Sequence, residues 1–122
     1  MSDGDWKSGK GEFSIDPILI KKWFEIPHDE EISINLPRVA FDALYAAIER
    51  PYFMAASITN YIIAQNMGNE EEADKAYNEI KESAVSGLNF LKHFQTVLMA
   101  RATETSLDPD GRVIEGDGSN GE

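Results

Sequence analysis

The chain of 122 residues contains no cysteine, and only two histidines are present. The absence of cysteine excludes disulfides, thiolate metal ligands and cysteine nucleophiles. The sequence also lacks an apolar run long enough to span a membrane. Its first residues, Met1 to Asp5, lack the basic and apolar regions of a signal peptide. We therefore expect a single-domain, soluble protein of the cytoplasm.

Basic residues are scarce, with 11 Lys and Arg against 22 Asp and Glu, for a net charge of −11. The excess is densest in residues 105–122, which carry five acids and one base. An acidic surface repels phosphate backbones and anionic lipids at long range. Nucleic acid and membranes are therefore not the expected partners.

The sequence also lacks the motifs of common enzymes. It has no phosphate-binding loop, no nucleophile elbow and no dinucleotide fingerprint. His28 and His93 have no second metal ligand at helical spacing, and the acidic tail lacks the later ligand positions of a calcium loop. We expect no catalytic residues, no metal site and no cofactor.

The residues that are present favour helices. Asp16-Pro17 is a helix-start signal, and Pro27 ends the short helix that follows. Apolar residues at helical spacing then predict three further helices near 38–50, 52–67 and 70–104, and Pro51 is expected to end or kink the first of them. The predicted fold is all-α or nearly so. It is an antiparallel helical hairpin with a long C-terminal helix, a short N-terminal helix and at most one short strand.

The expected organisation is a flexible arm over 1–13, a single helical domain over 14–104, and a disordered acidic tail over 105–122. The one candidate strand lies at 31–36, where Ile32, Ile34 and Leu36 alternate with polar residues.

The long helix has an apolar seam with a heptad alternation from Ala73 to Leu98. Ser83, Ala84 and Gly87 form a notch of small residues in the middle of that seam. A helix over 70–104 would span about 50 Å and would outrun a helix over 52–67. We therefore expect a homodimer or higher oligomer, with an interface at Ala84, Gly87, Leu91, Phe94, Leu98 and Arg101.

The segment from the candidate strand through Pro37 to the next two helices resembles a ribbon-helix-helix unit. In that family two chains pair their strands, and the outward strand side chains enter the major groove of DNA. The resemblance covers about 35 residues and implies possible DNA contacts at Ser33 and Asn35. The outward position at Glu31 and the break at Arg50-Pro51 depart from the pattern.

These observations support a small non-enzymatic interaction or regulatory protein that binds other proteins and self-associates through its long helix. Three alternatives stay open. The first is a ribbon-helix-helix-like DNA-binding regulator, and the second is an acidic inhibitor of a DNA-acting or host-defence protein. The third is a small-ligand binder at an oligomer interface, with Trp23, Tyr45, Tyr52 or His93 lining the pocket.

Overall fold

The computed structural model describes residues 5–8 and 13–114. It contains four helices in these ranges: α1 (Asp5–Ser8), α2 (Pro17–Phe24), α3 (Arg38–Asn66) and α4 (Glu70–Ala102). The described residues form no strand, apart from one isolated bridge between Leu107 and Val113. The predicted all-α fold, built on an antiparallel helical hairpin, is confirmed.

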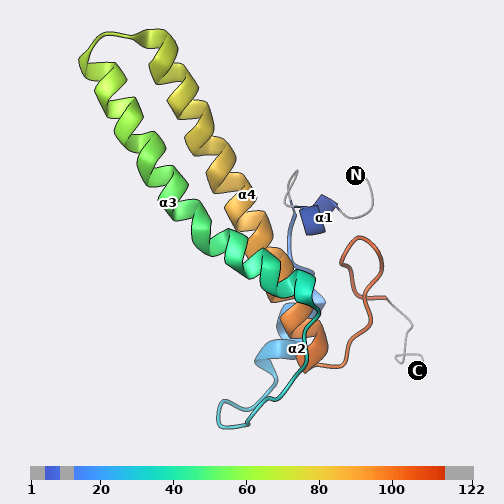
Figure 1. The fold of residues 1–122 in the computed structure, drawn as a ribbon. Helices are drawn as coiled ribbons and strands as arrows, with labels where there is room; N and C mark the ends of the chain where they lie inside the picture. Colours follow the sequence, from blue (N-terminus) through green and yellow to red (C-terminus); the bar gives the residue numbers. More distant parts are fainter. Residues whose placement is uncertain (1–4, 9–12, 115–122) are drawn as a thin grey trace.

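Helices α3 and α4 form the hairpin and lie side by side along most of their length (Figure 1). The turn between them contains Gly68, whose positive φ of 70° is a conformation that favours glycine. Asn69 caps α4 by accepting a hydrogen bond from the Glu72 backbone N–H at 3.2 Å. Three glutamates in the first turn, 70–72, complement the positive end of the helix dipole.

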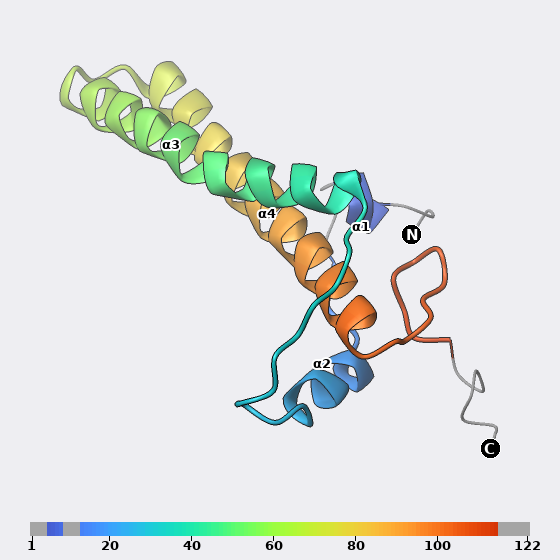
Figure 2. The ribbon, with the colours of Figure 1, turned by 60° about the horizontal axis from the view of Figure 1, so that its bottom comes forward.

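The prediction of two separate helices, 38–50 and 52–67, is wrong, because α3 runs through Pro51 as one helix of 29 residues. Of the two effects expected of this proline, an end or a kink, the helix does not end. Proline removes one backbone hydrogen bond and clashes with the preceding turn. The helix responds by bending near its middle (Figure 2). Packing against α4 on both sides of the proline explains why the helix resumes.

The length of α3 overturns a second expectation. At 1.5 Å per residue α3 is about 44 Å long and α4 about 50 Å long. α3 is therefore long enough to cover most of α4, rather than about half of it, and α4 continues without a break through Ser86 and Gly87.

Small side chains fill the contact between the two helices. The residues of α3 that are buried are Ala40, Ala43, Ser57 and Ala64, and Ala73 and Ala76 are buried on the first turns of α4. A seam of alanine and serine lets the two backbones approach closely, but it buries little apolar area per residue.

Among the described residues, the buried large side chains lie at the other end of α4, where α1, α2 and the segment after α4 gather (Figure 1). Trp6 is 2% exposed, stacks on Phe13 with 5.2 Å between ring centroids, and donates its indole N–H to the Pro109 carbonyl at 2.8 Å. Gly111 lies so close that an added Cβ would be 2.9 Å from the indole. Leu19 of α2 is fully buried nearby in the fold.

The start of α2 matches the sequence signal. Asp16 accepts the Ile18 backbone N–H at 3.0 Å, and its second carboxylate oxygen accepts the Val113 backbone N–H at 3.0 Å. One buried carboxylate thus caps a helix and holds the segment that follows α4.

The predicted arm and tail are only partly described. Residues 5–8 and 13 pack on the base of the hairpin, and residues 105–114 form a turned segment against Trp6. The rest of the arm (1–4 and 9–12) and of the tail (115–122) lies outside the described residues. Within the described ranges, no helix combines the length and the apolar character needed to cross a membrane.

Candidate protein-binding surface

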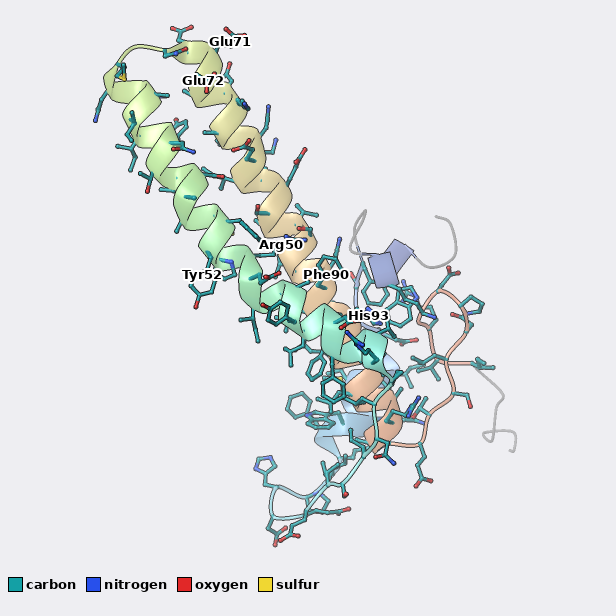
Figure 3. The ribbon with its side chains drawn as sticks, in the orientation of Figure 1. Arg50, Tyr52, Glu71, Glu72, Phe90 and His93 are labelled. Carbon is teal, nitrogen blue, oxygen red and sulfur yellow. The ribbon has the colours of Figure 1, made fainter. Side chains whose placement is uncertain are left out.

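Many large apolar side chains of the hairpin are exposed to solvent. Tyr52, which points away from α4 in Figure 3, is 75% exposed, and Leu88 is 55% exposed. Others that are exposed along α3 and α4 are Val39, Phe41, Tyr45, Ile48, Phe53, Ile58, Ile62, Ile63, Tyr77, Val85 and Leu91. Large exposed apolar patches are rare on monomers and mark interaction sites.

Part of this surface is hollowed into a groove of about 490 Å³ between α3 and α4. We call it the hairpin groove. Its walls are almost entirely apolar. It is lined by Leu44, Ala47, Ile48, Arg50, Pro51 and Met54 of α3, and by Ser83, Ala84, Gly87, Leu88 and Leu91 of α4.

The α3 wall of the hairpin groove belongs to a longer stripe along the helix. Its members share a spacing of four and three residues, the alternation by which helices pack together. They are Leu44, Ile48, Pro51, Ala55, Ile58 and Ile62. None of these side chains is buried within this chain. The stripe therefore has the pattern of a helix-packing seam without a helix against it.

Arg50 crosses the hairpin at the floor of the groove. A Cβ added to Gly87 would lie 3.0 Å from both Cβ and Cγ of Arg50, so the arginine stem fits against the glycine backbone. The guanidinium group lies 5.8 Å from the ring centroid of Phe53 and 5.4 Å from that of Phe90 (Figure 3). Its Nε has no hydrogen-bond partner among the described residues. Arg50 thus holds α3 and α4 together through packing and cation–π contacts.

The predicted interface residues of α4 fall in two groups. Ala84, Gly87 and Leu91 line the hairpin groove. Phe94 and Leu98 are half-buried, and Arg101 is exposed and donates a hydrogen bond to the Asn35 carbonyl at 2.7 Å. The notch of small residues at Gly87, expected to admit a partner helix, lies against Arg50 of α3 in the same chain. That these residues form an oligomer interface stays a prediction.

The possible DNA contacts, Ser33 and Asn35, are exposed in the connection between α2 and α3. Residues 31–36 form no strand in the structure, and α3 continues where the resemblance needs a turn. The ribbon-helix-helix arrangement is therefore not formed by the described residues of this chain.

The four residues of the predicted ligand pocket lie apart. Trp23 lines a cavity of about 390 Å³ formed with the connection that follows α2. Tyr45 and Tyr52 are exposed on α3, whereas His93 is buried under Trp6. That any of these side chains lines a ligand pocket at an oligomer interface stays a prediction.

His93 sits in an apolar environment at the base of the hairpin. It is 0% exposed and meets Trp6 edge to face, with 4.7 Å between ring centroids. Neither ring nitrogen has a hydrogen-bond partner among the described residues. Burial lowers the pKa of His93, and the nearby Lys7 ammonium lowers it further. The Lys7 backbone has a smaller effect, which raises the pKa. The neutral imidazole is therefore the favoured form.

Sequence reasoning missed the α3 wall of the groove. The spacing of Leu44, Ile48, Ile58 and Ile62 is visible in the sequence, but the stripe passes through Pro51. Treating that proline as a break divided the stripe into two short helices.

Comparison of the chain with protein-family models, with curated protein sequences and with solved structures finds no match. Within residues 5–8 and 13–114, no three His, Asp or Glu side chains are grouped so that they could hold a metal ion.

Proposed function

We propose that this chain is a small non-enzymatic protein of the interaction or regulatory kind, which acts by binding protein and which self-associates. Its binding surface is the hairpin groove together with the α3 stripe beside it. The sequence led us to expect self-association through the α4 seam alone. The proposed interface instead includes residues of both α3 and α4.

This proposal rests on one observation: in the hairpin, small side chains are buried and large apolar side chains are exposed. Alanine and serine are buried between α3 and α4, whereas Ile48 and Leu88 are 54% and 55% exposed. Leucine and isoleucine are normally among the most buried residues, because each contributes about 1.5–3 kcal/mol when it leaves water. A second protein surface over the groove would supply that burial.

Size-exclusion chromatography with light scattering at micromolar concentration tests the proposal. We expect the unmodified chain to have the mass of a dimer or a higher oligomer. Ile48→Glu combined with Leu88→Glu should give a folded monomer, because two carboxylates in the groove would be desolvated on association. Phe24→Glu, which changes an exposed aromatic residue of α2, is the matched control and should leave the mass unchanged. A monomeric unmodified chain would refute self-association.

A further inference from the structure

We infer that α1 is a latch that acid opens: when His93 takes up a proton, Trp6 leaves its place on the base and α1 separates from α4. We call α1 (Asp5–Ser8) the N-terminal latch. The groups that surround Trp6, namely Phe13, His93, Pro109 and Gly111, are the socket. The inference concerns the base of the molecule and does not depend on the proposed self-association.

Trp6 anchors the latch to the rest of the chain. It is 2% exposed, and its indole N–H donates to the Pro109 carbonyl at 2.8 Å. Its ring stacks on Phe13 and meets His93 edge to face, with 5.2 and 4.7 Å between the ring centroids. The next residue, Lys7, is exposed, and α4 is the helix on which α1 packs (Figure 1). Release of the latch therefore requires mainly that the contacts of this tryptophan break.

The walls of the socket are held by contacts that do not involve the latch. The Val113 backbone N–H donates to the Asp16 carboxylate at 3.0 Å, and the bridge between Leu107 and Val113 closes the segment after α4 on itself. On the other side, the Lys92 ammonium donates to the Phe13 carbonyl at 2.7 Å. Because these contacts are independent of α1, Trp6 can leave while the walls of the socket remain.

His93 is the titratable group in contact with Trp6. Neither of its ring nitrogens has a hydrogen-bond partner among the described residues. Burial and the Lys7 ammonium hold the pKa of His93 below its ordinary value of 6.5, against a smaller opposite effect of the Lys7 backbone. Opening the latch hydrates the imidazole and removes Lys7, so the pKa returns toward 6.5. The preference for the closed form, complete above this pH, is therefore lost as pH falls toward the lowered pKa.

The other charged groups at this part of the base are Lys7 of α1, Lys92 and Arg101 of α4, and Asp16, Asp108 and Asp110 of the connecting segments. The two cations of α4 donate to backbone carbonyls. Asp16 and Asp108 each accept two backbone N–H groups. No described carboxylate accepts a hydrogen bond from His93. A proton on His93 consequently has no hydrogen-bonded counter-ion in the closed form.

Hydrogen exchange of the Trp6 indole tests the latch. In the closed form this N–H is buried and hydrogen-bonded, so it exchanges with solvent through the open form. Nuclear magnetic resonance measures the exchange rate, and Trp23→Phe leaves Trp6 as the single tryptophan. The chain with His93 is compared at each pH with His93→Leu, which fills a similar volume and does not titrate. The ratio of the two rates cancels the intrinsic pH dependence of exchange.

Between about pH 7.5 and about pH 5.5, this ratio should rise by up to about tenfold for each unit by which closure lowers the pKa of His93. His93→Phe, which keeps a planar ring against Trp6, is a second non-titrating variant in case leucine disturbs the base. A ratio that stays constant over this range with both variants would overturn the latch.

Urea distinguishes release of the latch from unfolding of the base. The latch has four residues, so its release exposes little surface, and exchange of the Trp6 indole N–H should depend weakly on low concentrations of urea. The Val113 backbone N–H, bonded to Asp16 in the wall of the socket, is the internal control and should depend on urea more steeply. An equally steep dependence of both groups would mean that Trp6 is exposed when the whole base unfolds, which would overturn the inference.

Discussion

The base of the molecule and its hairpin bury side chains of different kinds. At the base, α4 is wrapped by α1, α2 and the segment after α4, and Trp6, Phe13, Leu19 and His93 are buried there. In the outer part of the hairpin, α3 is the element among the described residues that packs against α4, and the buried residues are alanine and serine. The chain thus encloses its large side chains only where it folds back on itself.

The base and the hairpin should therefore owe their stability to different contacts. The base should be stable in a single chain, because the groups that cover its core belong to the same chain. The hairpin contact is narrow and leaves its largest apolar residues in water, so its stability should rise when a partner covers the hairpin groove. Substitutions in the two regions should consequently respond differently to protein concentration.

The largest expected effect is that of Trp6→Ala at the base. This substitution removes the stacking on Phe13, the edge contact with His93 and the hydrogen bond to Pro109. Loss of a buried tryptophan costs about 3–5 kcal/mol. Urea denaturation should show this loss at both low and high protein concentration.

Trp6→Phe is the control for that experiment, since it keeps an aromatic ring and removes only the indole N–H and part of the volume. It should cost much less than Trp6→Ala. A Trp6→Ala chain with unchanged stability would mean that the base does not depend on the N-terminal segment, and the comparison between the two regions would fail.

A smaller effect is expected for Gly87→Leu in the hairpin. The new side chain would meet the Arg50 stem, which already lies 3.0 Å from the position of a Cβ at residue 87. Overpacking of this kind costs about 1–3 kcal/mol, even though leucine is the better helix former. The helices must separate and the groove must change shape, so light scattering should also record weaker self-association.

Glu82→Leu is the matched control, because it places the same side chain on an exposed part of the same helix. It should preserve both stability and mass. Equal behaviour of the two variants would show that the close contact of Gly87 with Arg50 is unimportant for the hairpin.

Much of the fold was predictable because its signals are local. Asp16-Pro17 predicts the start of α2, and Gly68 with Asn69 predicts the turn and the cap of α4. Each signal acts through one hydrogen bond or one backbone conformation, and neither depends on distant parts of the chain.

The features that the sequence did not predict depend on tertiary contacts. Pro51 is a helix breaker by local rules, yet packing of α3 on α4 carries the helix through it. Trp6 precedes a segment rich in glycine and lysine, and its burial depends on Pro109 and Gly111, about a hundred residues away. The groove was missed for the same reason, since its α3 wall requires one continuous helix.

The smallest expected effect is a dependence of stability on pH that arises at the base. In the folded chain, burial holds the pKa of His93 below its ordinary value of 6.5. Below about pH 6.5 the unfolded chain takes up a proton that the folded chain resists, so the stabilisation present above this pH is lost as pH falls toward the lowered pKa.

His93→Leu tests this dependence, because leucine fills a similar volume and does not titrate. Each unit by which the pKa is lowered corresponds to about 1.4 kcal/mol, and the measurement is urea denaturation at about pH 7.5 and about pH 5.5. The unmodified chain should lose stability between these values, and the variant should lose less. The difference should be the same at all protein concentrations, because His93 lies in the core that one chain closes by itself. A difference that vanished on dimerisation would place His93 in the part of the molecule that depends on its partner.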